Sequence, residues 1–189
     1  MKRITTIVLI LLIHCAVMGQ TLPGFTAPDV VSGKSFTLDH AASSKGAVIV
    51  FTSNTCPFDA YYYARLNKLA ADFSGRIPFV FVNSHSGQDE SVEAMKALAA
   101  SRGFNVPYLA DKNQAIMRQF KVTKSPEAIV LKRTNNGFTI FYRGAIDDNA
   151  QVATDVHQHY LADAINALLS GQSAARPVVR PMGCNIRQH

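Results

Sequence analysis

The stretch AVIVFTSNTCPFD, residues 47–59, decides the fold and the candidate chemistry of this chain. It opens with an apolar run rich in β-branched residues, as is typical of a strand buried on both faces. After a polar turn at residues 52–55, apolar residues recur with the spacing of one helix face: Phe58, Tyr62, Leu66, Leu69 and Phe73. The stretch therefore predicts a buried strand, a short loop and the start of a helix.

Cys56 and Pro57 stand where this helix is expected to begin. Proline is favoured at the first helical position, which makes Cys56 the N-cap residue. The unpaired amides and the positive end of the helix dipole at that point favour an anion, so the Cys56 thiolate should be stabilised and reactive. The alternative is that Cys56 is a small buried residue without chemistry.

The segment resembles the active-site region of the thioredoxin-like superfamily, and it is closest to the redoxin branch that includes alkyl hydroperoxide reductase/thiol-specific antioxidant and TlpA-like proteins. Asn-x-Cys-Pro-Phe at 54–58, taken with Gly-Cys-Asn-Ile-Arg at 183–187, is similar to a subgroup of exported redoxins. The resemblance runs from about residue 22 to the end of the chain. It implies a thioredoxin-like α/β fold with a mixed central β-sheet flanked by helices. It also implies that Cys184 either folds back to resolve Cys56 or forms a lasting disulfide with it.

The chain has 189 residues, of which 48% are hydrophobic, enough for one globular domain with a sizeable core. Residues 1–19 have the pattern of a secretory signal peptide. Lys2 and Arg3 form its basic region, 7–13 its apolar region, and cleavage is expected before Gln20. The apolar run is too short for a stable membrane span, so we expect an exported protein, periplasmic or extracellular.

Charge and cysteine content narrow the classes of partner. Without Lys2 and Arg3 the chain has 17 basic and 13 acidic residues, and the basic ones are scattered, so no nucleic-acid surface is expected. Two cysteines, Cys56 and Cys184, remain after the signal, and in an exported protein such a pair readily forms a disulfide. No zinc-ligand spacing and no phosphate-binding loop is present, so no metal or cofactor is expected.

Alternating strands and helices predict a sheet that is parallel in its first half, and a hairpin turn at 135–137 adds antiparallel strands. The further expected strands are 35–38, 77–83, 106–109, 127–131 and 138–142; the further helices run from Asp89 or Ser91 to 101, over 112–120 and over 157–169. These elements make one domain, 20–171, followed by a tail, 172–189, which carries Cys184 and is expected to be irregular.

Ser125-Pro126 precedes a strand in the second half of the chain. Its placement resembles the cis-proline loop that faces the active-site cysteine in thioredoxin-like folds. The resemblance implies that Pro126 is cis and that the Ser125 backbone lies beside Cys56, where a substrate strand or mixed disulfide would pair. Pro57, Ser125 and Pro126 are thus the expected substrate-binding residues.

Asp59 occupies the position of the second cysteine in a Cys-x-x-Cys motif, so this chain cannot resolve a mixed disulfide there. Two interpretations of Asp59 remain open. It relays a proton and weakens the stabilisation of the thiolate, or it is an ordinary acidic residue in the first turn of a helix.

The peroxidase motif Pro-x-x-x-Thr/Ser-x-x-Cys is only partly present. Ser53 matches the hydroxyl position, but Ile49 stands where the motif has proline. Arg118 and Arg143 are candidates for the cation that such a site needs. A typical peroxiredoxin is therefore disfavoured.

Two further groups allow a functional or an ordinary interpretation. His85 follows a strand and either activates the thiol or, as we favour, is a solvated loop histidine. Asp147 and Asp148 suggest a metal or acid–base site, but ordinary loop and helix-start acids are favoured.

The sequence thus predicts an exported thiol–disulfide oxidoreductase in which Cys56 is the attacking thiolate and Cys184 is the candidate resolving cysteine. Its expected partners are protein thiols and disulfides or small peroxides, together with an external thiol reductant. The alternatives are a thiol peroxidase in which Cys56 becomes a sulfenic acid, and a binding module that keeps the groove without turnover.

Overall fold

The computed structural model describes residues 21–41 and 43–189, so the expected signal peptide lies outside the described residues. Among the residues it describes, no helix is long and apolar enough to cross a membrane.

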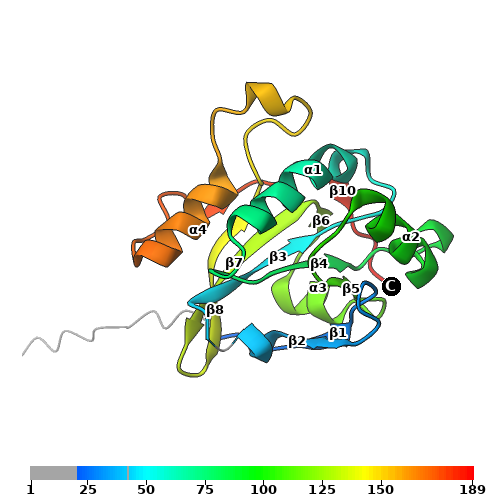
Figure 1. Ribbon diagram of the computed structural model, residues 1–189, viewed down its shortest axis with the longest axis horizontal. Helices are drawn as coiled ribbons and strands as arrows, with labels where there is room; N and C mark the ends of the chain where they lie inside the picture. Colours follow the sequence, from blue (N-terminus) through cyan, green and yellow to red (C-terminus); the bar gives the residue numbers. More distant parts are fainter. Residues whose placement is uncertain (1–20, 42) are drawn as a thin grey trace, which may run out of the picture.

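A six-stranded mixed sheet forms the centre of the molecule, in the order β5-β4-β3-β7-β8-β9 (Figure 1). Its strands are β3 (Gly46–Phe51), β4 (Phe79–Asn83), β5 (Tyr108–Ala110), β7 (Glu127–Thr134), β8 (Gly137–Gly144) and β9 (Val178–Val179). Strands β3, β4 and β5 are parallel, whereas β7 runs antiparallel to β3 and β8 antiparallel to β7. Every residue of β3 is buried, as the apolar run predicts for a strand covered on both faces.

Helices cover both faces of this sheet, and successive residues of β3 point into the two layers. Val48 and Val50 pack in the core cluster that includes residues of α1 (Pro57–Asp72), α2 (Val92–Arg102) and α4 (Tyr160–Ser170). Ile49 and Phe51 pack in a second cluster with α3 (Ala115–Phe120) and the hairpin β1 (Thr26–Pro28)–β2 (Ser35–Thr37), on the lower side of Figure 1. Short 3₁₀ helices occur at Leu38–Ala41, Gln88–Glu90 and Ala153–Asp155.

Two helices begin later than the sequence predicts, and in both cases an aspartate that precedes the helix accepts backbone amides at or just before its first turn. The helix expected from 112 begins at Ala115, because the Asp111 carboxylate accepts the amides of Ile116 and Met117. The closing helix begins at Tyr160, because Asp148 accepts the amide of His157 and holds the preceding chain extended.

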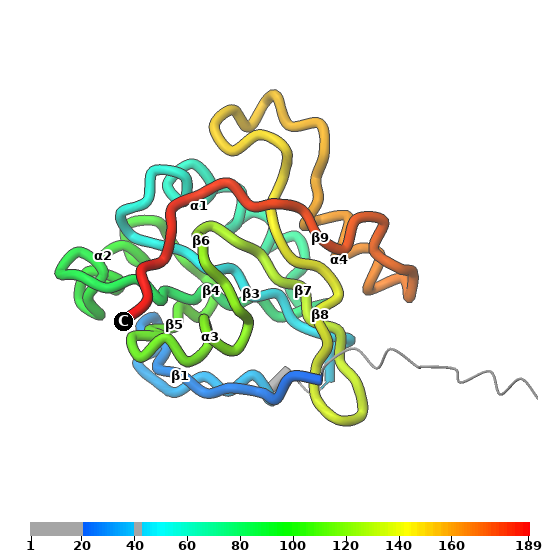
Figure 2. The backbone as a smooth tube through the Cα atoms, turned by 180° about the vertical axis from the view of Figure 1, so that it is seen from behind, coloured from blue at the N-terminus to red at the C-terminus, as the bar shows by residue number. Residues whose placement is uncertain are grey.

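The tail is more ordered than the sequence predicts. Val179 and Val178 form β9 at the sheet edge, and Cys184–Asn185 form β10, which pairs antiparallel with β6 (Lys124–Ser125). Figure 2 shows the tail, in red, running from the α4 side past β6 to an end beside α3. The backbone groups at the outer edge of β8 and along β6 need hydrogen-bond partners, and the tail strands β9 and β10 supply these partners.

Candidate functional site

Cys56 and Cys184 form a disulfide. The sulfurs are 2.02 Å apart, the Cα atoms 6.0 Å apart, and the bond joins positions separated by 128 residues. Cys56 is 4% exposed, whereas Cys184 is only partly buried. Cys184 is thus paired with Cys56, as both of the roles that the resemblance implies for it require.

The local geometry of Cys56 is the one that Cys-Pro at a strand-to-helix turn predicts. Cys56 is the N-cap of α1 with extended backbone angles, and Pro57 stands in the first turn. The cap position has no side-chain hydrogen bond of its own. Instead, the Ser53 hydroxyl accepts the Cys56 amide at 3.1 Å and the Thr55 amide at 3.1 Å. Cys56 therefore stands at the positive end of the α1 helix dipole.

Glu90 holds the loop between β3 and α1, and nothing in its local sequence indicates this role. It is 3% exposed although it lies in a 3₁₀ helix outside the sheet. One carboxylate oxygen accepts the hydroxyls of Ser53 (2.6 Å) and Thr55 (2.7 Å) and the Thr55 amide (3.1 Å). The other accepts the Asn54 amide at 2.9 Å and the Asn83 side chain at 2.6 Å.

These hydrogen bonds fix the charge state of Glu90. Burial acts to raise its pKa, but the hydrogen bonds from Ser53, Asn83, Asn54 and Thr55 outweigh it, and the pKa lies below its ordinary value. Glu90 is therefore a carboxylate at neutral pH. A buried carboxylate with this many donors is a fixed acceptor that sets the shape of the loop carrying Cys56.

The Ser125–Pro126 peptide bond is cis, as its placement implies. The Ser125 carbonyl oxygen lies 3.6 Å from the Cys56 sulfur. The pairing edge of β6, however, is occupied by the protein's own tail, since Cys184 is opposite Ser125 and Asn185 opposite Lys124. The edge that the resemblance assigns to a substrate strand is thus filled by β10 in the disulfide form.

Gly183 explains how the tail comes so close to this loop. A Cβ atom at position 183 would lie 2.0 Å from the Ser125 carbonyl oxygen and 2.9 Å from the Pro126 nitrogen. Those neighbours are backbone atoms and cannot yield as a flexible side chain can. Glycine before Cys184 is therefore a requirement of the close approach that brings the two sulfurs together.

Asp59 lies inside the protein rather than on the surface of the first helical turn. Its carboxyl group is fully buried, and neither oxygen has a hydrogen-bond partner among the described residues. Burial raises its pKa well above the ordinary 3.8, and the charge of Glu90 adds to this, although Ser125 and the Ser53 backbone nearby partly favour the charged form. A carboxyl group of this kind takes up and releases protons in a range where most aspartates stay ionised.

We expect Asp59→Asn to change the pH dependence of stability. Because the folded pKa is raised, wild type holds its proton more tightly when folded than when unfolded. Relative to Asp59→Asn, its free energy of unfolding should be highest below about pH 4, and should fall by about 1.4 kcal/mol per pH unit until the folded pKa is passed. Urea unfolding of the oxidised proteins between pH 3 and 8 measures this difference. A difference that stays constant across this range would mean that folding does not raise the pKa of Asp59.

His85 is not the solvated loop histidine that the sequence favours. It is partly buried, and its Nε2 lies 2.8 Å from the Ser125 hydroxyl oxygen. Burial lowers its pKa, and the nearby Lys112 adds to that effect while Glu90 opposes it. A neutral imidazole thus reaches the serine that also borders Cys56, which supports the alternative that places His85 at the site.

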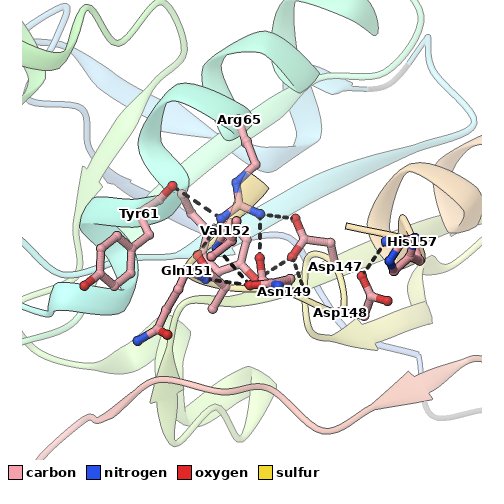
Figure 3. A network of polar contacts seen from close by, with 10 residues as sticks. Tyr61, Arg65, Asp147, Asp148, Asn149, Gln151, Val152 and His157 are labelled. Carbon is pink, nitrogen blue, oxygen red and sulfur yellow. Dashed lines mark hydrogen bonds and ion pairs between the residues drawn. The ribbon is translucent and has the colours of Figure 1, made fainter. Parts of the chain in front are cut away.

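Asp147 and Asp148 are structural acids, as favoured from the sequence. Figure 3 shows Arg65 of α1 directed at Asp147 and at the loop behind it. The guanidinium contacts the Asp147 carboxylate at 2.5 Å and donates to the Asn149 carbonyl at 2.8 Å, and the Tyr62 hydroxyl donates to Asp147 at 2.8 Å. Within the described part of the chain, no cluster of His, Cys, Asp and Glu fits a metal ion.

The groups considered for peroxide binding are engaged elsewhere. Arg143 donates to the Glu127 carboxylate at 2.6 Å and 3.0 Å, and Arg118 donates to the Asn113 carbonyl. The Ser53 hydroxyl, which matches the peroxidase motif, donates to Glu90. In this state, neither the hydroxyl nor these cations are directed at the Cys56 sulfur for a peroxide.

Comparison with known proteins agrees with this geometry. The model of the AhpC/TSA family matches residues 18–153, well over half of the chain. The chain belongs to the AhpC/TSA family. No curated protein sequence matches it.

Solved structures confirm a thioredoxin-like fold with a mixed central sheet for this AhpC/TSA family member. A hypothetical protein from Sinorhizobium meliloti is 29% identical, with a TM-score of 0.81, over 90% of this chain and 94% of that one. A secreted disulfide oxidoreductase from Mycobacterium tuberculosis, homologous to Escherichia coli DsbE, is 24% identical (TM-score 0.55; 76% and 95% covered). The peroxidoxin BcpB of the same organism is 19% identical (TM-score 0.60; 82% and 97% covered). The last two likenesses are evidence for the fold alone.

Proposed function

We propose that the protein is a two-cysteine thiol–disulfide oxidoreductase. The observation that carries this proposal is the disulfide between Cys56, at the start of α1, and Cys184, in a tail strand paired beside the cis-proline loop. Membership of the AhpC/TSA family and the position of Cys56 at the start of α1 support redox chemistry at this bond. Pro57, Ser125 and Pro126 border the site, and Ser53 and Asp59 act as auxiliary residues around it.

The exchange chemistry starts with an external thiolate. The thiolate attacks the Cys184 sulfur, a new sulfur–sulfur bond forms there, and the bond to Cys56 breaks, so that Cys56 leaves as a thiolate. A second thiol of the same donor loses its proton and attacks the donor's sulfur in this mixed disulfide. Cys184 is then released as a thiolate. The donor ends as a disulfide, and the protein gains two electrons and takes up protons at its thiolates. Run in reverse, the same steps pass two electrons to a substrate disulfide.

Exposure and leaving-group stability both favour Cys184 as the sulfur that carries the mixed disulfide. Cys56 is nearly buried, whereas Cys184 is partly exposed. A thiolate that leaves at the start of a helix is stabilised by the amides and the dipole, and a better thiolate leaves faster. The sequence alone suggests Cys56 as the substrate-facing sulfur. The geometry of the disulfide form favours Cys56 as the leaving group and as the thiolate that closes the disulfide again.

Trapping the mixed disulfide tests the proposal. Oxidised protein is mixed briefly with reduced glutathione, quenched with N-ethylmaleimide and mapped by peptide mass, with Cys184→Ser as the control that has no disulfide to attack. We expect glutathione on Cys184 and maleimide on Cys56, with roughly tenfold less of the opposite arrangement. Glutathione mainly on Cys56 would reverse the assignment of the two sulfurs. A disulfide that reacts with dithiothreitol only in denaturant, in a protein without insulin-reducing activity, would show that the bond is structural and that the proposed function is wrong.

Peroxidase activity is the competing proposal, because the family includes alkyl hydroperoxide reductase. The engagement of Ser53 by Glu90 and of Arg143 by Glu127 favours disulfide exchange instead. Consumption of hydrogen peroxide by the reduced protein, with a sulfenic acid trapped on Cys56 in Cys184→Ser, would favour the peroxidase.

We also propose that the protein works outside the cytoplasm, in the periplasm or beyond it. The disulfide and the pattern of residues 1–19 support export, since disulfides persist in oxidising compartments. The mature chain would then begin at Gln20, which N-terminal sequencing of the protein from its host checks.

A further inference from the structure

The last residues of the tail are held by contacts that do not involve the disulfide. The Ile186 amide donates to the Thr123 carbonyl at 2.8 Å, and its side chain, 6% exposed, packs in the core cluster around α3. Beyond it, the Gln114 side chain donates to the Arg187 carbonyl at 2.7 Å and accepts the His189 amide at 3.1 Å. These contacts begin two residues after Cys184 and continue along the chain away from it.

Gln114 is built to receive this segment. It is fully buried and stands just before α3 with a left-handed backbone (φ 56°), a conformation that non-glycine residues seldom adopt. Its amide nitrogen also donates to the Ser84 carbonyl at 3.0 Å, which fixes the orientation of the side chain. The amide group therefore presents a donor and an acceptor to backbone groups of the tail, so it recognises an extended chain rather than particular side chains.

We propose that two contacts keep residues 183–189 docked when the disulfide is reduced: the Ile186 side chain in the core around α3, and the hydrogen bonds of Gln114 to the tail backbone. We call these two contacts together the docking site. In the reduced protein the site holds the Cys184 thiol opposite Cys56 and raises the effective concentration of one thiol toward the other. It also keeps the edge of β6 covered by the tail in both redox states, so an incoming partner meets Cys184 before it meets the cis-proline loop. The inference rests on the proposed function only in assuming that the two thiols and the disulfide interconvert.

The redox equilibrium measures this docking directly. Wild type and variants are equilibrated with mixtures of reduced and oxidised glutathione, and the fraction of protein disulfide gives the effective concentration of the Cys56–Cys184 pair. We expect Ile186→Ala to lower it by at least about tenfold, because the variant loses most of a buried aliphatic side chain. Gln114→Ala, which loses two hydrogen bonds to the tail, should lower it by about tenfold. Asn185→Ala is the matched control, since Asn185 is exposed between Cys184 and Ile186, and its value should stay within about twofold of wild type.

A second measurement separates this inference from the proposed function. In Cys184→Ser, where no disulfide forms, the Ile186 amide should still be protected from hydrogen exchange, and Ile186→Ala in that background should abolish the protection at this position. Fast exchange of the Ile186 amide in Cys184→Ser, or effective concentrations equal in all four proteins, would overturn the docking site. If the wild-type disulfide cannot be reduced in the native state, the proposed function fails, and the exchange measurement in Cys184→Ser still decides the docking.

Discussion

Replacing Glu90 with alanine is expected to lower the free energy of unfolding by about 3–5 kcal/mol. The substitution leaves the hydroxyls of Ser53 and Thr55, the amide of Asn54 and the side chain of Asn83 without their charged acceptor. Hydrogen bonds to a charged group contribute more than neutral ones, and buried donors left without a partner keep their full desolvation cost. The partly exposed donors at 54 and 55 regain water, which limits the loss.

The pH dependence of this loss has a definite sign. The pKa of Glu90 is lowered in the folded protein, so its contribution is present above the unfolded pKa and disappears as the pH falls through the folded pKa. Wild type and Glu90→Ala should therefore differ most at neutral pH and converge in acid. This trend is opposite to the one expected for Asp59 in the first turn of α1, whose burial outweighs the groups that favour its charged form.

Glu93→Ala is the control for Glu90→Ala. Glu93 is exposed in the first turn of α2, and its removal should change stability by no more than about 0.5 kcal/mol. Glu90→Gln keeps the shape and one acceptor oxygen, and should fall between wild type and alanine. Urea unfolding at pH 7 gives the free energies, and the rate of Cys56 alkylation against pH in the reduced proteins reports whether the loop still presents the thiolate. Equal stabilities for the two alanine variants would mean that Glu90 does not hold the loop.

Local sequence patterns were sufficient to predict the elements that place Cys56. The apolar run before Thr52 and the Cys-Pro pair at the helix start are short-range signals, and strand β3 and helix α1 follow them closely. The cis bond before Pro126 and the pairing of Cys184 came from the resemblance, because nothing local to either residue specifies the other. Local patterns thus predicted the Cys56 end of the disulfide, whereas they did not predict the tail strand that carries Cys184.

The parts that the sequence does not predict depend on contacts between distant segments. Glu90 is a polar residue in a polar stretch, and its burial becomes visible only once β4 ends beside the loop after β3. His85 likewise belongs to the site only through its contact with Ser125, and Gln114 holds the tail only through its hydrogen bonds to the tail backbone. The tail appeared irregular because Pro177 and Pro181 interrupt it, yet its short strands are completed by edges elsewhere in the fold. Polar partners at long separation carry no periodicity, so no local pattern reveals them.

Reducing the disulfide is expected to lower the free energy of unfolding by about 5 kcal/mol, the largest single effect expected for this protein. The bond joins positions separated by 128 residues. Closing so long a loop lowers the conformational entropy of the unfolded chain and so raises its free energy. Denaturant unfolding of oxidised wild type, reduced wild type and Cys184→Ser measures the effect. Cys184→Ser should match reduced wild type and should not respond to dithiothreitol.

The same quantity is accessible from the redox equilibrium, and the two measurements must agree. By the thermodynamic cycle, a difference of about 5 kcal/mol corresponds to an effective concentration of the thiol pair some 10³–10⁴ times higher in the folded than in the unfolded protein. That ratio assumes that the tail stays docked when reduced, because a tail released on reduction gains freedom that stabilises the reduced folded state. A stability difference near 5 kcal/mol therefore supports both the long-loop argument and the docking by Ile186 and Gln114. A difference of only about 1 kcal/mol, with a correspondingly low effective concentration, would contradict the prediction and would mean that the disulfide itself holds the tail.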